Sequence, residues 1–212
     1  MEIDVLRQNK TWTIEALSPG HKALKRHWVY KAKKGPNGEI MKFKVCWVIK
    51  GYKQKYGIDY IETFTSMVKP MSYKALFALA AALDYKIEQM DFITAFLNGS
   101  LKEIIHVEQP HGFELGDGVC CLLRALYGLK QSPRVWYETL YDFLIAIGFT
   151  RTHADHSIFT HANGIIITVY IDDLQIFGLD MENICLLKKK LTECFNMIDL
   201  GPATYYLGIQ IT

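Results

Sequence analysis

The chain has 212 residues, half of them apolar, with 24 basic and 22 acidic side chains and a formal net charge of +2. This length suits one large domain or two subdomains that share a core, and the composition is that of a folded protein rather than a disordered one. No basic segment followed by an apolar one opens the chain and no run of about eighteen apolar residues occurs, so we expect no secretion signal, no membrane span and a cytoplasmic location.

The N-terminal third is predicted to contain a basic β-hairpin. Residues 1 to about 23, which include the break Ser18-Pro19-Gly20, are expected to form a loosely attached lead-in segment before the domain at 24–212. Strands are predicted at 27–33 and 40–49 around a Gly-Pro-Asn-Gly turn at 35–38. Between residues 22 and 55 there are eleven basic residues and one acid, interleaved with aromatic residues. This hairpin therefore indicates either a nucleic-acid-binding surface or a merely solvated face.

Helices and strands then alternate without a regular βαβ repeat. We expect a helix capped by Ser72, a strand at 86–91, a turn at 94–99, a strand at 104–107, and a helix with Ser132 as cap and Pro133 in its first position. Strands at 157–161 and 164–169 surround Asn163-Gly164, a strong hairpin signal. The pattern predicts an α+β fold: an antiparallel sheet with helices packed on one face.

In the C-terminal part, the stretch 170–177 is predicted to extend this sheet and to be followed by a helix and a final strand at 204–211. Asp180 can cap the helix, with Ile184, Leu187, Leu191 and Phe195 as its buried stripe. Lys188-Lys189-Lys190 on this helix is expected to be a solvated face.

Two adjacent acids, Asp172 and Asp173, stand inside the apolar run 165–177. Buried carboxylates are nearly always paired or bound to a metal, although a turn in water is the simpler alternative for an Asp-Asp pair. Asp91 ends another predicted strand and Asp172 and Asp173 are predicted at a tight turn, so three carboxylates can lie on neighbouring strands. Such a set is typical of a magnesium site for two-metal phosphoryl transfer.

Ordered motifs over residues 24–212 resemble the reverse transcriptases of copia-type long-terminal-repeat retrotransposons. Tyr170-Ile171-Asp172-Asp173 is similar to the Y-x-D-D box of that family. The other matching blocks are 57–60 with 62–64, 89–91, 94–99, 108–110, 126–134, 199–201 and 206–209. The resemblance implies the palm and fingers of a right-hand polymerase, with the thumb missing, from a Pol polyprotein whose RNase H and integrase are not in this chain.

The resemblance also implies a role for particular residues. Asp91, Asp172 and Asp173 would hold two Mg²⁺ ions, with Mn²⁺ as an alternative, and would add deoxynucleoside triphosphates to a DNA primer on an RNA or DNA template. Phe96 would exclude a 2′-hydroxyl group. The nucleotide or template contacts would come from Thr94, Ala95, Tyr127, Gly128, Lys130, Lys44 and Lys50, and the primer grip from Leu207 and Gly208.

Several positions depart from the family pattern. Cys46 replaces an arginine of the fingers strand, Ile93 and Ile198 stand where lysines are common, and Gln175 interrupts a strand that is usually apolar. These changes leave a second hypothesis open: a catalytically inactive, partly decayed relic that retains the fold and nucleic-acid binding.

Other metal-binding patterns are weaker. His153, His156 and His161 favour surface or capping roles over zinc binding. The five cysteines are odd in number and lack C-x-x-C spacing, which argues against a disulfide framework or a zinc ribbon, and Cys120-Cys121 is expected to be a buried strand pair.

Overall fold

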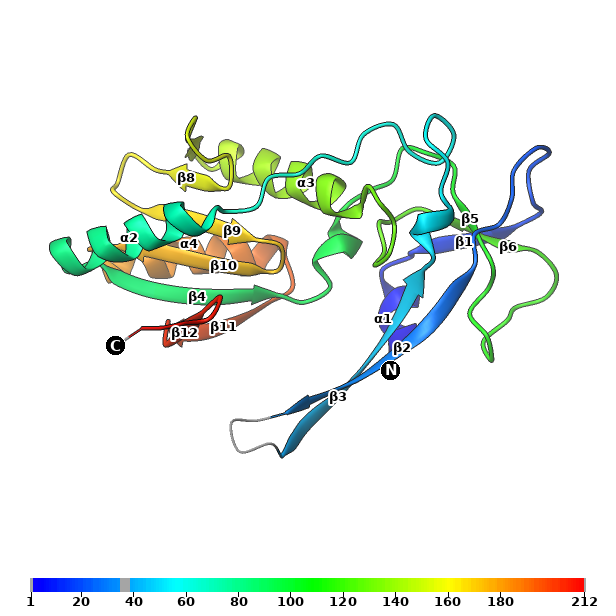
Figure 1. Ribbon diagram of the computed structural model, residues 1–212, viewed down its shortest axis with the longest axis horizontal. Coiled ribbons are helices and arrows are strands. Elements are labelled where there is room, and N and C mark those ends of the chain that lie inside the picture. The colour runs from blue at the N-terminus through cyan, green and yellow to red at the C-terminus, as the bar shows by residue number, and fades with distance from the viewer. Residues whose placement is uncertain (1, 35–38, 212) are drawn as a thin grey trace. The chain divides into compact units, whose positions relative to one another are not determined.

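The computed structural model describes residues 2–34 and 39–211, and the chain folds as two compact units (Figure 1). Unit 1 combines residues 1–64 with residues 96–136, and unit 2 combines residues 65–95 with residues 137–212. The mixture of helices and antiparallel strands confirms the predicted α+β class. Within the described ranges, no helix has the length and apolar character needed to cross a bilayer.

Unit 1 consists of a small antiparallel sheet and a long hairpin. Its elements are α1 (Glu2–Gln8), β1 (Trp12–Glu15), β2 (Arg26–Lys34), β3 (Ile40–Ile49), the 3₁₀ turn η1 (Gly51–Lys53), β5 (His106–Val107) and β6 (Val119–Leu122). The sheet has the order β1-β6-β5, and β2 pairs with β3 as predicted. The turn predicted at 35–38 lies outside the described residues.

Residues 2–15 are packed within unit 1. Ile3 and Leu6 lie three positions apart on α1 and are 2% and 1% exposed. Leu6 belongs to the same core cluster as Trp47 and Ile105, and every residue of β1 pairs with β6. The expected loose attachment is therefore wrong here, because a short amphipathic helix and an edge strand bury their apolar side chains against the sheet.

Unit 2 is organised around a six-stranded antiparallel sheet of order β11-β4-β10-β9-β8-β7 in the described part of the chain. The strands of this sheet are β4 (Lys86–Phe92), β7 (Thr150–Arg151), β8 (Ile158–Thr160), β9 (Ile166–Tyr170), β10 (Asp173–Gly178) and β11 (Met197–Pro202), and β12 (Tyr205–Tyr206) and β13 (Ile209–Gln210) form a separate two-stranded hairpin. The helices are α2 (Pro70–Leu83), most of α3 (Ser132–Ala146) and α4 (Met181–Cys194). The predicted hairpin at Asn163-Gly164 is confirmed, as is the Asp180 cap of α4, whose carboxylate accepts the Glu182 N–H at 2.8 Å.

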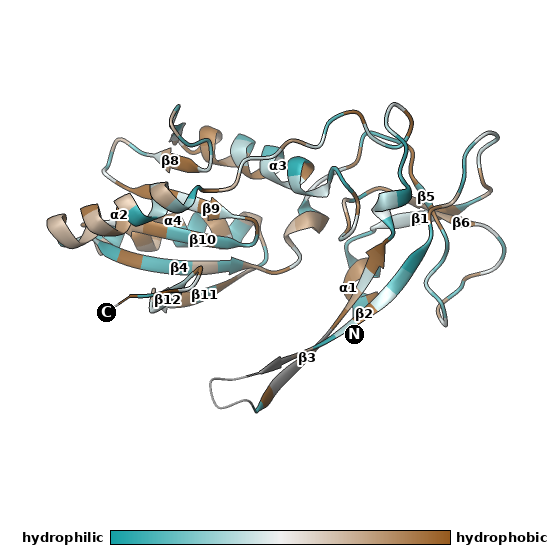
Figure 2. Ribbon diagram, in the orientation of Figure 1, coloured by the Kyte–Doolittle hydropathy of each residue, from teal (hydrophilic) through white to brown (hydrophobic). Residues whose placement is uncertain are grey.

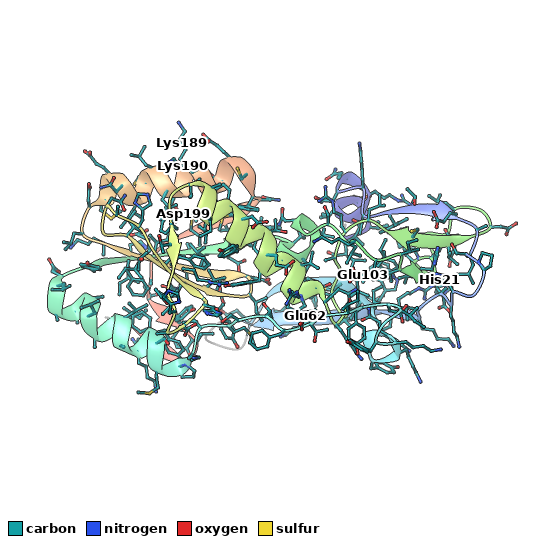
Figure 3. The ribbon with its side chains drawn as sticks, turned by 90° about the horizontal axis from the view of Figure 1, so that it is seen from above. His21, Glu62, Glu103, Lys189, Lys190 and Asp199 are labelled. Atoms are coloured by element: carbon teal, nitrogen blue, oxygen red, sulfur yellow. The ribbon has the colours of Figure 1, made fainter. Side chains whose placement is uncertain are left out.

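Helices cover both faces of this sheet, as the views in Figures 1 and 3 agree. Phe77 of α2 contacts Phe177 of β10, with ring centroids 5.7 Å apart. Phe195, which follows α4, contacts Phe92 of β4 at 5.5 Å. Phe177 is opposite Ile87, five residues from Phe92 along β4, so the two contacts lie on opposite faces. The prediction of helices on one face is wrong, because α2 has its own aromatic contact with the strand face that carries Asp91.

The start of α2 also differs from the prediction. The helix begins at Pro70 with Lys69 as its N-cap residue, two positions before Ser72 is reached. Proline suits the first helical position because its missing N–H needs no partner there. The Asp155 carboxylate accepts the N–H of Lys69 at 2.8 Å, so a residue distant in sequence holds the helix start.

The centre of the sheet is apolar and closely covered. Figure 2 shows hydrophobic and hydrophilic residues alternating along β4, and Met90 and Phe92 are the buried ones near its end. Leu174 and Ile176 of β10 are fully buried. On β4, the alternation of buried and half-buried residues fixes which face carries Asp91.

Lys188 of α4 is part of a shielded ion cluster. Its ammonium group lies 2.6 Å from Glu88 and 2.7 Å from Asp199, and the Lys188 and Glu88 side chains are only 11% and 7% exposed. Burial lowers the pKa of Lys188, but the hydrogen bonds to Asp199 and Glu88 outweigh it and raise the pKa. The prediction of a solvated face holds for Lys189 and Lys190, which point away from the sheet in Figure 3, and is wrong for Lys188.

We expect Lys188→Met to lower the free energy of unfolding by about 3 kcal/mol, because it leaves the Glu88 carboxylate buried without its cation. Lys189→Met on the same helix is the matched control and should change stability by less than about 0.5 kcal/mol. Urea unfolding followed by far-ultraviolet circular dichroism measures both. Equal stability of the two variants would contradict the assignment.

The ion cluster of Lys188 also predicts that the stability of the fold depends on pH. A raised pKa means that the ion cluster stabilises the fold below the ordinary lysine value of 10.5 and that this contribution is lost as the pH rises through the raised value. The stability difference between the unmodified chain and Lys188→Met should therefore be constant near neutral pH and shrink in strongly alkaline solution.

Candidate active site

The three acids singled out in the sequence lie together in unit 2. Asp91 near the end of β4 and Asp173 at the start of β10 are directly opposite each other in the antiparallel pair. Side chains at such positions share a face, with Cβ atoms about 4.5–5.5 Å apart. Asp172 precedes Asp173 in the turn between β9 and β10, and all three acids are half-buried.

A two-residue turn holds Asp172 in place. Tyr170 pairs with Asp173, so Ile171 and Asp172 form the turn, and Ile171 has a φ of +56°. β-branched residues rarely adopt this left-handed conformation, which costs about 1–2 kcal/mol. The Asp172 carbonyl accepts the N–H of Phe92 at 2.9 Å, next to Asp91. The backbone thus sets the position of the acid pair relative to β4.

The donor set fits a hard divalent cation. Two carboxylates at facing positions repel each other, and a cation bound between them removes that repulsion. Carboxylate oxygens are the ligands that Mg²⁺ prefers, and it commonly combines one or two of them with substrate phosphates. Asp91, Asp172 and Asp173 offer only oxygen ligands, from two paired strands and the turn beside them.

The C-terminal hairpin packs near these acids within unit 2. The strand predicted at 204–211 is in fact β12 and β13, joined by Leu207 and Gly208, whose φ angles of +44° and +88° make a tight two-residue turn. Tyr206 is 2% exposed and contacts Tyr73 of α2 at 5.6 Å. Burial raises the pKa of Tyr206, and the negative charge of Asp173 acts in the same direction. Leu207 and Tyr170 border the same apolar cluster, so the hairpin turn and the acid pair share one support.

Thr94 and Ala95 follow β4 at the end of unit 2. Thr94 has a φ of +56°, and its hydroxyl donates to the carbonyl of Ile93 at 2.6 Å. Ala95 is fully buried and begins the 3₁₀ turn η2 (Ala95–Asn98), through which the chain enters unit 1.

Most of the other predicted site residues gather at one corner of unit 1. Phe96 is 7% exposed and meets Tyr127 edge-on, with ring centroids 4.6 Å apart. The Tyr127 carbonyl accepts the N–H of Ile49 at 2.9 Å, which places Tyr127 and Gly128 beside Lys50. Exposed Lys130 lies over the ring of Tyr60, 4.6 Å from its centroid.

Lys44 is the exception among the unit 1 residues. It pairs with Lys31 in the middle of the β2–β3 hairpin, roughly 20 Å along the strand from Lys50. Its side chain is outside the described part of the structure. The hairpin backbone therefore keeps Lys44 apart from the corner that contains Lys50.

The corner depends on a close approach of two backbone segments. A Cβ atom added to Gly51 would lie 1.9 Å from the carbonyl oxygen of Gly128, and one added to Gly128 would lie 2.0 Å from that of Ile49. Gly128 also has a φ of +96°, which favours glycine. Only residues without a side chain allow this contact.

Two buried glutamines, which the sequence analysis did not single out, lock the same corner. The Gln54 side-chain amide donates to Gln131 at 2.9 Å, and its oxygen accepts the N–H of Lys130 at 2.8 Å. Gln131 donates in turn to the Asp59 carbonyl at 2.8 Å. Gln131 lies inside a family-like block and could have been suspected, but Gln54 is 77 positions away and carries no signal of its own.

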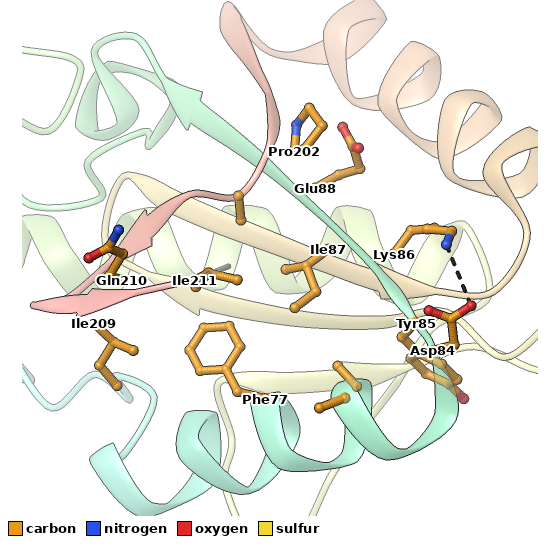
Figure 4. Close-up of a pocket in the computed structure, with 13 residues that line it drawn as sticks. Phe77, Asp84, Tyr85, Lys86, Ile87, Glu88, Pro202, Ile209, Gln210 and Ile211 are labelled. Carbon is orange, nitrogen blue, oxygen red and sulfur yellow. Dashed lines mark ion pairs between the residues drawn. The ribbon is translucent and has the colours of Figure 1, made fainter.

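A separate pocket of about 530 Å³ lies in unit 2 between the end of α2, the start of β4 and the C-terminal hairpin (Figure 4). Phe77, Ile87 and Ile209 line it, and an ion pair of Lys86 with Asp84 stands at its edge. Lys86 is opposite Gly178, the far end of β10 from Asp173. The pocket is therefore distinct from the acids.

Comparison with known proteins gives a consistent result. A family model described as "Reverse transcriptase (RNA-dependent DNA polymerase)" matches residues 9–212. The chain is 41% identical, over 99% of its length, to the Retrovirus-related Pol polyprotein from transposon TNT 1-94 of Nicotiana tabacum, and 34% identical over 99% to that from transposon RE1 of Arabidopsis thaliana. A truncated transposon Ty1-A Gag-Pol polyprotein of Saccharomyces cerevisiae is 31% identical over 66% of the chain. The matches span 16%, 15% and 12% of these relatives.

The glycine contact at the unit 1 corner makes a testable prediction. Gly51→Ala should destabilise unit 1 by about 3 kcal/mol or more, because its Cβ would overlap the Gly128 carbonyl. Gly57→Ala is the matched control: its φ is +79° but nothing lies within 4 Å of the new Cβ, so only about 1 kcal/mol of backbone strain is added.

Tryptophan fluorescence in a urea titration measures both variants, since all four tryptophans are in unit 1. A Gly51→Ala midpoint at or above that of Gly57→Ala would show that the two segments are not held in contact.

Proposed function

The chain belongs to the reverse transcriptase family, and from this premise we propose that it catalyses RNA-directed DNA synthesis. It would add deoxynucleotides to the 3′ end of a DNA primer paired with an RNA or DNA template. The observation that supports this most directly is the facing pair Asp91 and Asp173, with Asp172 fixed in the adjoining turn. A solvated Asp-Asp turn would need neither the third acid nor a strained Ile171.

In this proposal Asp91, Asp172 and Asp173 hold two Mg²⁺ ions, for which Mn²⁺ could substitute. The bound ions would stabilise the attacking and leaving oxygens of an in-line phosphoryl displacement. The task of the protein is to hold the carboxylates at fixed positions, and the β4–β10 pairing together with the Phe92–Asp172 hydrogen bond supplies that rigidity.

Membership of the reverse transcriptase family also suggests which residues contact the nucleotide. Thr94 and Ala95 would offer backbone contacts to the triphosphate, and Lys50, Lys130 and Lys44 positive charge to phosphates. Tyr127 and Gly128 would line the nucleotide and template site. Phe96 would exclude the 2′-hydroxyl of a ribonucleotide. Its packing against Tyr127 supports this role because it restricts the ring to one orientation.

The Leu207-Gly208 turn would hold the primer 3′ end. The anchoring of Tyr206 on α2 supports this assignment, since it gives the turn a rigid base in the unit that carries the acids. We assign unit 2 to the palm, and residues of unit 1 to the fingers. The relatives are Pol polyproteins of which the chain spans less than a fifth, so a thumb, an RNase H and an integrase are proposed to lie outside residues 1–212.

A catalytically inactive relic is the second candidate, and Gln175 favours it. Its side chain is fully buried in β10, and neither its amide nitrogen nor its oxygen has a hydrogen-bond partner in the described structure. A buried, unsatisfied amide costs about 1–3 kcal/mol. Such a cost is expected where selection for activity has relaxed, which makes the activity assay decisive.

Asp172→Asn should reduce extension of a DNA primer on an RNA template by more than about 100-fold, because it removes a metal-binding carboxylate with little change in shape. Asp142→Asn, at an exposed position of α3, is the control and should keep full activity. If the unmodified chain is as inactive as Asp172→Asn while both bind the primer–template duplex, the relic is the correct reading.

Phe96→Val should raise the incorporation of ribonucleotides relative to deoxyribonucleotides by about 10-fold or more, because a smaller side chain leaves room for the 2′-hydroxyl. Phe149→Val, a similar truncation in the core of unit 2, should leave that ratio unchanged. The ratio of ribonucleotide to deoxyribonucleotide incorporation does not depend on how much folded enzyme is present. If Phe96 had a purely structural role, Phe96→Val would therefore leave this ratio unchanged.

A further inference from the structure

The geometry points to a Zn²⁺-binding site in unit 1 formed by Glu15, His106 and Cys121. One ligand atom of each residue lies within 4.8 Å of those of the other two. These residues belong to unit 1, whereas the acids assigned to the polymerase belong to unit 2. The site therefore does not depend on the proposed polymerase activity.

The sheet register explains why these three side chains meet. His106 of β5 is directly opposite Cys121 of β6, so their side chains share one face. On the other side of β6, Cys121 faces Thr13 of β1, and Glu15 lies two positions further along the same face. The long Glu15 side chain spans this diagonal, and its carboxylate oxygen is 2.9 Å from Nε2 of His106.

The spacing of the ligand atoms is close to that of a tetrahedral site. Zinc binds sulfur at about 2.3 Å and imidazole nitrogen or carboxylate oxygen at about 2.0–2.2 Å, which places neighbouring ligand atoms roughly 3.3–3.7 Å apart. The Glu15–His106 separation of 2.9 Å is shorter than this, and the upper limit of 4.8 Å for the set is about 1 Å longer. Small side-chain rotations would therefore bring the three atoms around one ion.

The site is buried on the His106 side and open to solvent on the Glu15 side. The His106 side chain is fully buried, Cys121 is half-buried, and the Glu15 side chain is 41% exposed. The ring of His21 packs edge-on against that of His106, with centroids 5.4 Å apart, and limits its rotation. An ion can enter from the side of Glu15, and water would complete the fourth position.

The ligand types favour zinc over the magnesium of the acid site. A thiolate, an imidazole and one carboxylate form a mixed sulfur, nitrogen and oxygen set, which suits a borderline ion and not a hard one. The competing explanation is a hydrogen-bonded cluster in which Glu15 accepts from both His106 and Cys121. Both arrangements use Nε2 of His106 and leave its buried Nδ1 without a hydrogen-bond partner in the described structure, so metal titration decides between them.

The test is metal binding by the whole chain after treatment with a chelator. In excess Mg²⁺, which occupies the carboxylates of unit 2, titration with Co²⁺ should produce a thiolate-to-cobalt charge-transfer band that saturates at one ion per chain, and Zn²⁺ should then displace the cobalt. Cys121→Ser should abolish the band, and Glu15→Gln should weaken Co²⁺ binding at least 10-fold while keeping the band at saturation. Cys185→Ser, at an exposed position of α4, is the control and should behave as the unmodified chain does.

Folding of each variant is checked by its thermal unfolding without metal, which should match that of the unmodified chain because the Cys121 and Glu15 side chains reach solvent. In excess Mg²⁺, Zn²⁺ should raise the melting temperature of the unmodified chain and of Cys185→Ser, but not of Cys121→Ser. Absence of a charge-transfer band in the unmodified chain, or an undiminished band in Cys121→Ser, would overturn the proposal.

Discussion

The pairing of β4 with β10 is the constraint on which unit 2 depends. It places Asp91 opposite Asp173, and the Phe92–Asp172 hydrogen bond continues the contact into the turn. The register is fixed by burial, because Met90 faces Leu174 in the core on the side opposite the acids. A slip by one residue would exchange the two faces, burying one carboxylate among apolar side chains and exposing an apolar residue.

How much the sequence predicts depends on whether the signal is local. The Asn163-Gly164 hairpin, the Asp180 cap and the acid-bearing turn were predicted because a few adjacent residues determine each of them. The side of the sheet covered by α2, the packing of α1 and the ion partners of Lys188 were not, because they depend on contacts between distant segments. Lys188 shows this most clearly: three consecutive lysines look alike in the sequence, and only the position of Glu88 on β4 separates one from the others.

The candidate site shows the same division. The three acids were found from their residue types and the apolar sequence around them, and the family resemblance indicated the residues near Tyr127. The polar support of that corner was missed: Gln54 and Gln131 act through a hydrogen bond between segments that meet only after folding. The Glu15, His106 and Cys121 cluster was missed for the same reason, since its members come from three strands and have no recognisable spacing.

During synthesis, β4 is made long before the two strands that pair with it. It is an inner strand of the sheet, yet its partners β10 and β11 come about 80 and 110 residues later in the chain. All of unit 1 is synthesised by residue 136, so it can fold while β4 still has both edges unpaired. Long-range pairing of this kind is slow, and unpaired strand edges associate readily with other chains. Synthesis of unit 2 therefore includes a period in which both edges of β4 are unpaired, and that period ends only when β10 and β11 are available.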